Sequence, residues 1–474
     1  MLQDSYETDK YFEHIISQLM IELEPVLAEI DQLLEDEELY QLIRNDLAKR
    51  YPQTEVTGRK STPVEVIIRI LAVKRLYGLS YEKVERQVSD SLVLRLFCRV
   101  YFNEVPDDTT LIRWANEIEA ETLKAFNRRL TELATGLKVT KGRKLRTDGT
   151  VVESNIHSPS DSSLLVDGVR VIGRTLSRAR EVLEETSSLN KAEFRNRIRS
   201  ARRLARQIGE AMRKRSETAK EKGVETYRKL VSVAQETIKQ AEKVMAELRT
   251  QATSQTEKLT KTLETFIPPM EQVVEQTIRR VFQGEQVPAT EKIVSLFEPH
   301  TSIICRNKPR KPVEYGHKIW IDEVDGGIVT RWEVLQGNPN DTSQWTPSLE
   351  NHVQLFGKPP VQASADRGVY SAPNEQKAKD LGVKHVILPK PGYKSEDRKQ
   401  FENQRWFKQG RKWHNGVEGR ISVLKRSFDI DRCLDHGEDG FDKWVGWGVI
   451  ANNLRNIGHA LTANVTVVQV EAES

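Results

Sequence analysis

The stretch LRTDGTVVESN, residues 145–155, is rich in β-branched residues and carries Asp148 in an otherwise uncharged core. Because β-branched side chains pack well on a pleated surface, this composition predicts a β-strand. A carboxylate buried in a strand is costly unless it is paired or bound to a metal ion. The position of Asp148 therefore needs an explanation that packing alone does not give.

Strand patterns return beyond residue 300. The segment YGHKIWID, residues 315–322, the turn at Asp325–Gly327 and the segment IVTRWEVL, residues 328–335, together predict a β-hairpin. Two helices and two short strands are expected to follow, and the first of these strands ends in Asp366. These four elements are expected at 347–355, 361–366, 374–381 and 384–390.

The order of the elements from Leu145 onward decides the expected fold. It is strand, a long insertion, two strands, helix, strand, helix, strand and helix. Without the insertion, this is the order of an RNase H-like fold, a mixed five-stranded sheet with flanking helices. The first and fourth strands are neighbours in such a sheet, so we expect Asp148 and Asp366 to lie side by side.

The last expected helix lies in RWFKQGRKWHNGVEGRISVLKRSF, residues 405–428. His414, Glu418 and Lys425 share one helical face, because their spacing is i, i+4 and i+11. A second, apolar stripe is typical of a face buried on a core. It consists of Val417, Ile421, Leu424 and Phe428. Glu418 is then either a ligand for a hard cation near a phosphate backbone or a surface acid among surface bases.

Asp148, Asp366 and Glu418 thus lie on three elements that the predicted fold brings together. Carboxylates without His or Cys partners are hard oxygen ligands, which suit Mg²⁺ or Mn²⁺. A pair of such ions is the usual device for phosphodiester chemistry. We therefore expect the three acids to hold two Mg²⁺ or Mn²⁺ ions and to be the catalytic residues.

Residues 161–299 form the expected insertion and are helical in pattern. Apolar residues repeat at heptad spacing in two runs, 194–212 and 227–248, with a polar break at Lys214–Gly223 between them. This pattern predicts an antiparallel helical hairpin. The pair Pro268–Pro269 is expected to end the next helix.

The insertion is also the most basic part of the chain. Residues 170–265 contain 23 basic and 13 acidic residues. Such an excess predicts a nucleic-acid contact, with Arg202 and Arg206 as candidate DNA-binding residues. A solvated helical hairpin that serves only as a spacer would have a similar composition.

The N-terminal part is expected to be an all-α region. Residues 1–55 are acidic and carry apolar residues at helical spacing, which predicts a packing or dimerisation arm. At 56–138, a helix that stops at Gly78 and a second helix capped by Ser80 have helix-turn-helix spacing. The basic residues that favour DNA binding by this region are Arg69, Lys74, Arg75, Arg86 and Arg113. A short helical cluster of this kind can also be purely structural.

Length and composition bound the remaining possibilities. A chain of 474 residues is too long for one ordinary core, so several domains are expected. Cys98, Cys305 and Cys433 lie far apart and support neither a zinc site nor a disulfide framework. The chain has no leader pattern and no apolar run of about 18 residues, which predicts a soluble, cytoplasmic protein.

Three stretches of the chain resemble the DDE transposases of bacterial insertion sequences. They are RTDGTVVESNIHSPSDSSLL around Asp148, ASADRGVYS around Asp366 and HNGVEGRISVLKRSF around Glu418. The resemblance covers roughly 140–160 and 300–460, and more loosely the helices at 60–120.

The resemblance implies roles for single residues. Asp148, Asp366 and Glu418 would be the metal ligands, and Lys425, together with His414, would contact DNA. Many members of the family have an arginine four residues before the glutamate, where this chain has His414. Several also carry their insertion just before the last helix, whereas here it falls between the first and second strands.

The implied activity is that of a transposase acting on double-stranded DNA as a homodimer. It would bind the ends of an insertion sequence, cleave a strand and join the freed 3′-hydroxyl to target DNA. Two other classes remain open, namely a catalytically inactive, domesticated transposase that only binds DNA and a structural coiled-coil protein. The expected domains are 1–55, 56–138, a catalytic domain at 139–160 and 300–460, an insertion at 161–299 and a tail at 461–474.

Overall fold

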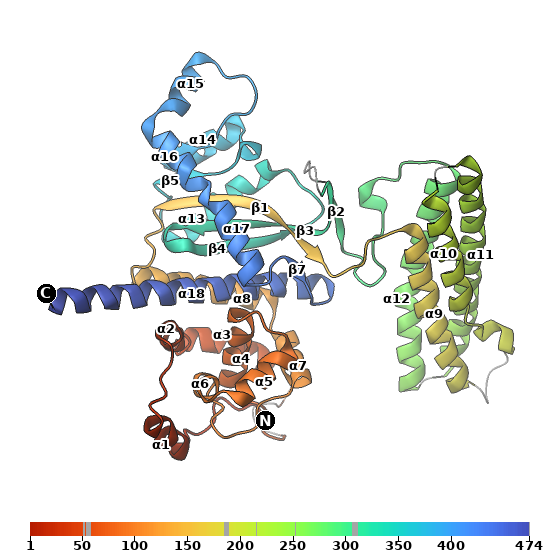
Figure 1. The fold of residues 1–474 in the computed structure, drawn as a ribbon, viewed down its shortest axis with the longest axis horizontal. Coiled ribbons are helices and arrows are strands. Elements are labelled where there is room, and N and C mark those ends of the chain that lie inside the picture. Colours follow the sequence, from red (N-terminus) through yellow and green to blue (C-terminus); the bar gives the residue numbers. More distant parts are fainter. Residues whose placement is uncertain are drawn as a thin grey trace. The chain divides into compact units, whose positions relative to one another are not determined.

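A computed structural model describes residues 1–50, 53, 58–183, 189–214, 216–251, 253–305 and 311–473. The chain forms two compact units (Figure 1). One comprises Met1–Glu153 with His317–Ser474, and the other comprises Ser154–Gly316. The predicted domain boundary at residues 55 and 56 lies outside the described residues, as does Arg215, one of the basic residues of segment 170–265.

The sheet has the strand order that the sequence predicts. Five strands lie in the order β4-β3-β1-β5-β6, with β3 and β4 antiparallel and β1, β5 and β6 parallel. Numbered along the chain, this order is 3-2-1-4-5, which is that of an RNase H-like sheet. The strands are β1 (Lys144–Ser154), β3 (Val313–Val324), β4 (Ile328–Leu335), β5 (Gln362–Ser364) and β6 (His385–Ile387).

Two short strands extend the predicted five to seven. β2 (Ser302–Cys305) pairs with the first residues of β3, and β7 (Arg432–Cys433) pairs with β1. The mixed sheet of the RNase H-like prediction is otherwise confirmed.

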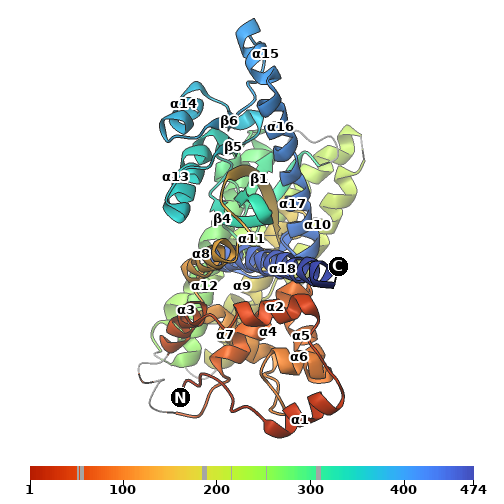
Figure 2. The same ribbon diagram turned by 90° about the vertical axis from the view of Figure 1, so that its left-hand side faces the viewer.

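Helices cover both faces of this sheet. Figure 2 shows α13 (Trp345–Phe356) and α14 (Ala372–Asp380) on one side and α16 (Arg405–His414) and α17 (Gly416–Ser427) on the other. The single helix expected around Glu418 is therefore two, separated at Asn415. Between α14 and α16, α15 (Glu396–Asn403) completes this part of the chain.

The sequence predicts that the helix carrying Glu418 is the last one, and this prediction is wrong. Helix α17 is followed by α18 (Gly437–Glu473), which runs through most of the expected C-terminal tail. α18 packs on β4 and also on the N-terminal helices α2 (Pro25–Leu33), α4 (Val64–Leu76) and α8 (Ala120–Gly136) (Figure 1). It thereby joins the sheet to the N-terminal region in one core.

The N-terminal region is all-α, as predicted. Besides α2, α4 and α8, it contains α1 (Lys10–Gln18), α3 (Glu37–Ala48), α5 (Tyr81–Asp90), α6 (Leu92–Phe97) and α7 (Asp108–Glu117). Gly78 ends the turn after α4 with φ of +62°, and the Ser80 hydroxyl accepts a hydrogen bond from the Lys83 amide at the start of α5. Both helix signals read from the sequence are therefore correct.

One part of the DNA-binding interpretation of this region is wrong. Arg69, Lys74 and Arg75 are buried, because α4 is apolar on nearly all sides and forms the centre of the N-terminal core. Arg69 pairs with Asp31, and Arg75 donates to the carbonyl of Trp444. These three cations stabilise the fold and do not face solvent.

The insertion is a bundle of four helices, not a hairpin. Its helices are α9 (Asp161–Leu183), α10 (Ile198–Met212), α11 (Glu217–Leu248) and α12 (Ser254–Thr277), which share one apolar core. As predicted, α10 and α11 pack on each other, but α9 packs on both and α12 packs on α9 and α11. Pro268 and Pro269 lie inside α12 and do not end it. No helix in the described ranges is both long and apolar enough to cross a membrane.

Candidate active site

Asp148 lies on β1, and Asp366 lies at the equivalent register position just after the neighbouring strand β5. The register of β1 and β5 pairs Arg146 with Ser364, and each aspartate lies two residues further along its strand direction. The two carboxyl groups are close enough for the charge of Asp366 to act on Asp148. The structure therefore brings together the two acids that the sequence had predicted to be neighbours.

The surroundings move the pKa values of these two acids in opposite directions. Burial, followed by the nearby charge of Asp366, raises the pKa of Asp148 to about 6. The hydrogen bond from His414 lowers the pKa of Asp366. Two acidic groups that repel each other in this way form a place where a cation would be stabilised.

His414 supports Asp366 from the end of α16. Its Nε2 lies 3.0 Å from Oδ1 of Asp366, and its side chain is only 7% exposed. A neutral His414 that donates this bond carries its proton on Nε2. In the described part of the chain, its Nδ1 atom has no hydrogen-bond partner. A DNA contact by His414 stays a prediction, whereas its contact with Asp366 is a feature of the fold.

Glu418 stands apart from the two aspartates. It lies in the first turn of α17, is exposed, and makes no hydrogen bond or ion pair with any residue that the structure describes. Within the described ranges, no three His, Cys, Asp or Glu side chains are grouped to hold a metal ion. Asp148 and Asp366 thus fit a hard divalent cation by their chemistry, and Glu418 is not brought to them.

A further acid near this pair was missed in the sequence. The charge of Asp341 also raises the pKa of Asp148, and Asp341 itself pairs with Lys318 of β3. Lys318 in addition donates to the carbonyl of Pro339 at 3.0 Å. The only sequence signal for Asp341 is the acid of the NPND segment, residues 338–341, which follows β4.

Lys425 has two partners within the protein. Its Nζ donates to the carbonyl of Val151 on β1 at 2.6 Å and lies 3.2 Å from Asp431. These contacts attach α17 to the strand that carries Asp148. A phosphate contact would compete with them, and it stays a prediction.

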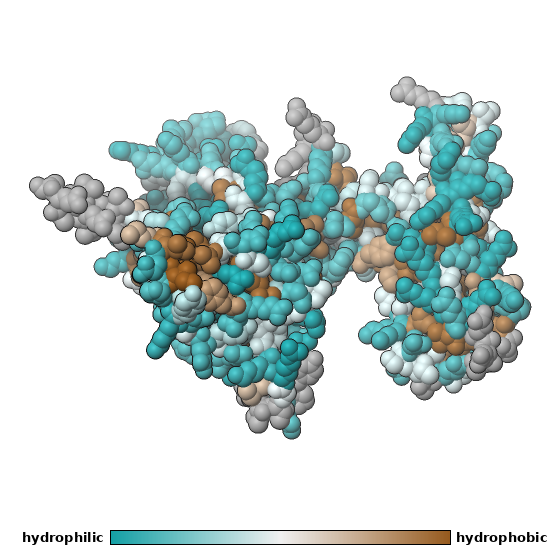
Figure 3. Space-filling view, turned by 60° about the horizontal axis from the view of Figure 1, so that its bottom comes forward, coloured by the Kyte–Doolittle hydropathy of each residue, from teal (hydrophilic) through white to brown (hydrophobic). Residues whose placement is uncertain are grey.

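The other candidate DNA-binding residues are exposed. Arg86 lies on α5, and Arg113 lies on α7, where it donates to Thr109 and Thr110 in the first turn of its own helix. Arg202 and Arg206 lie on α10, and Arg206 pairs with Glu210. Figure 3 shows hydrophilic side chains over much of the surface, in keeping with such exposed charged groups.

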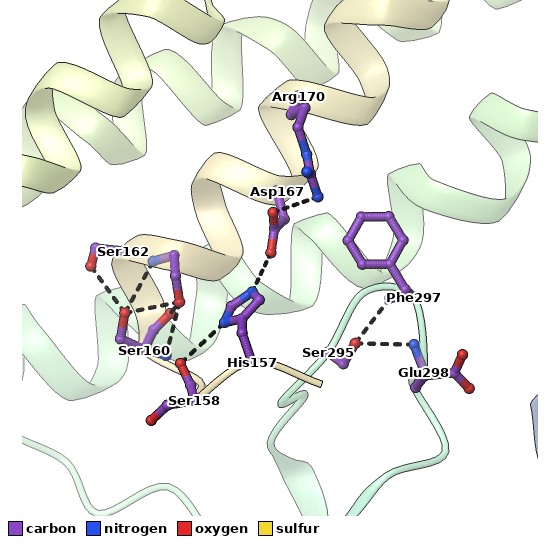
Figure 4. Close-up of polar contacts among 10 residues, drawn as sticks. His157, Ser158, Ser160, Ser162, Asp167, Arg170, Ser295, Phe297 and Glu298 are labelled. Carbon is purple, nitrogen blue, oxygen red and sulfur yellow. Dashed lines mark hydrogen bonds and ion pairs between the residues drawn. The ribbon is translucent and has the colours of Figure 1, made fainter. Parts of the chain in front are cut away.

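A Ser, His and Asp cluster at the start of α9 does not form a nucleophilic triad. His157 Nε2 lies 2.7 Å from Asp167, and its Nδ1 faces the carbonyl of Ser158 (Figure 4). The Ser160 hydroxyl bonds to Ser162 and Ser163 instead of His157. The cluster therefore fixes the entry into α9.

Comparison with known families bears on the N-terminal region. Residues 17–117 match a family model described as Transposase domain (DUF772), and the matched segment spans α2 to α7. This match supports a transposase, and with it a DNA-processing enzyme. Neither a comparison with curated proteins nor one with solved structures gave a match. The match does not reach Asp148 or Asp366.

Proposed function

We propose that this protein is a DNA transposase that cleaves and joins DNA strands by a DDE mechanism. The observation that carries the proposal is the position of Asp148 and Asp366 side by side, one on β1 and the other just after the adjacent strand β5, in a sheet with the RNase H-like strand order. The transposase-domain match at residues 17–117 supports the same class from an independent part of the chain.

Asp148 and Asp366 would hold Mg²⁺ or Mn²⁺, with Glu418 as the third ligand. Bound ions of this kind activate water and neutralise charge on a phosphodiester. The protein's own contribution is to keep the two aspartates adjacent, to orient Asp366 through His414, and to attach α17 to β1 through Lys425. Double-stranded DNA is the proposed substrate of a homodimer, with Arg86, Arg113, Arg202 and Arg206 as backbone contacts.

One observation favours a second candidate, a catalytically inactive protein that only binds DNA. Glu418 is exposed and separate from the two aspartates in the described part of the chain, whereas an active centre needs its third ligand close by. This alternative predicts DNA binding without cleavage in any divalent ion.

A supercoiled plasmid that carries the coding sequence with its flanking DNA separates the two candidates. Glu418→Gln should bind this plasmid as the wild type does and should lose strand cleavage in Mg²⁺ and Mn²⁺. A matched control is Glu438→Gln, an exposed acid in the first turn of α18. Cleavage by Glu418→Gln at the wild-type rate would remove Glu418 from the proposed ligand set.

A further inference from the structure

Glu323 of β3 is a buried acid that accepts hydrogen bonds from arginines on two different elements. Arg146 of β1 donates Nε and Nη2 to its two carboxylate oxygens at 2.8 and 2.7 Å, and Arg420 of α17 donates Nε at 3.2 Å. Glu323 is 1% exposed and lies at a shift in the register between β3 and β4. Such bulges turn a side chain away from the regular alternation of its strand.

Arg146 also binds the helix pair directly. Its Nη1 donates to the carbonyl of Trp413 at 2.6 Å, and its guanidinium carbon lies 4.8 Å from the centre of the Trp413 ring. Arg420 in turn donates Nη1 to Asn452 of α18 at 2.9 Å. The junction of α16 and α17 is therefore held from the sheet and from α18.

The spacing of these contacts along the chain relates them to the candidate active site. Arg146 lies two residues before Asp148 on the same face of β1. Trp413 directly precedes His414, the residue that binds Asp366, and Arg420 lies two residues after Glu418. Glu323 thus ties the strand that carries Asp148 to the helix that carries Glu418, and Arg146 extends this contact to α16, whose last residue binds Asp366.

We propose that Glu323 and Arg146 are positioning residues that fix the α16–α17 junction against β1, so that His414 and Glu418 are held relative to Asp148. Their role in cleavage rests on the proposed function. They touch neither DNA nor the reacting atoms in this account, and they act through His414 and Glu418.

Two glycines are consistent with a junction built around these arginines. A Cβ atom at Gly416 would overlap Nη1 of Arg146, and a Cβ atom at Gly327 would overlap Nη2 of Arg420. By contrast, a Cβ atom at Gly419, one turn further along α17, would meet nothing within 4 Å. Gly416 and Gly419 therefore form a matched pair on one helix.

The test compares Gly416→Ala, Arg146→Lys and their double variant with Gly419→Ala. Gly416→Ala and Arg146→Lys should each raise amide hydrogen exchange in residues 405–427, and should lower plasmid cleavage about 100-fold at unchanged DNA binding. The double variant should cost little more than either single change, because both disturb one contact. Arg331→Lys, which alters a partly buried ion pair of β4 with Asp322, controls for a general loss of charge pairing.

Each outcome decides the matter. The positioning role would be overturned if Gly416→Ala showed the same hydrogen exchange and the same cleavage as Gly419→Ala. It would also be overturned if the effects of the two single changes on cleavage were fully additive in the double variant. If neither wild type nor variants cleave DNA but exchange still rises only in Gly416→Ala and Arg146→Lys, the junction stands and the proposed function fails. If Gly416→Ala does not fold, Glu323→Gln gives the same comparison with Arg331→Lys as control.

Discussion

The Nε2 atom of His414 lies 3.0 Å from Oδ1 of Asp366, which joins the end of α16 to the residue that follows β5. This contact connects the predicted helical face of His414, Glu418 and Lys425 to Asp366. The bond makes the orientation of Asp366 depend on a residue 48 positions away.

Replacing His414 should therefore affect cleavage more than binding. His414→Gln should lower the cleavage rate by about 10- to 100-fold, because partners that orient a ligand commonly contribute that much. DNA affinity at fixed salt should stay within about twofold of wild type. His459→Gln, an exposed histidine of α18, is the control. Weakened binding with normal cleavage of the bound DNA would instead make His414 a DNA contact.

The basic face of α10 should contribute to DNA affinity through phosphate contacts. Arg202→Gln with Arg206→Gln should reduce the slope of log K against log salt by about two units, because each lost phosphate contact removes roughly 0.9. Lys258→Gln with Lys261→Gln removes the same charge from the exposed face of α12 in the same bundle. An equal slope change in both pairs would mean that the bundle attracts DNA only through its net charge.

The buried cations of α4 should matter for stability and not for DNA binding. Arg69→Ala leaves Asp31 with only Arg99 as partner and removes a bond to the carbonyl of Phe97. Breaking a buried pair should lower the free energy of unfolding by about 3–5 kcal/mol. Arg86→Ala, on the exposed face of α5, should weaken DNA binding without this loss. Thermal unfolding and filter binding of both variants test the distinction.

The stability of the unit that contains the sheet should decrease in mild acid. Burial lowers the pKa of His352 to about 4, compared with about 6.5 in an unfolded chain. Between these values the unfolded chain binds a proton that the folded chain does not, so the free energy of unfolding falls as pH decreases from about 6.5 to about 4. The loss attributable to this residue is about 2 kcal/mol between pH 7.5 and 5.

Urea unfolding followed by tryptophan fluorescence measures this effect. All 8 tryptophans belong to the unit formed by Met1–Glu153 and His317–Ser474, so the signal reports that unit alone. His352→Gln should flatten the pH dependence, whereas His14→Gln on the exposed face of α1 should leave it as in wild type. A wild-type dependence in His352→Gln would assign the acid sensitivity to another group.

The sequence predicts the sheet well because its signals are local. β-branched runs, a DGG turn and the helix cap at Ser80 each act over a few residues, and the structure has the expected elements at these places. The adjacency of Asp148 and Asp366 follows from strand order alone.

What could not be predicted depends on contacts between distant segments. The apolar residues on nearly all sides of α4 already indicate a buried helix, but the partners of Arg69 and Arg75 come from distant segments, Asp31 and the carbonyl of Trp444. The sequence also gives no signal for the break between α16 and α17, because Asn415 keeps helical backbone angles. The position of Glu418 relative to the aspartates depends on this junction and on the Glu323 contacts, which join residues 177 and 97 positions apart.

The central claim is that Asp148 and Asp366 together support DNA cleavage, and mapping the cut tests it most directly. The wild-type protein is incubated with Mg²⁺ and the plasmid that carries its coding sequence and flanks, and the DNA ends are sequenced. The account predicts cuts at the two boundaries of the element, with 3′-hydroxyl ends, that disappear in Asp148→Asn while plasmid binding remains. Identical cuts by Asp148→Asn, or binding by the wild type without any cut in Mg²⁺ or Mn²⁺, would contradict it.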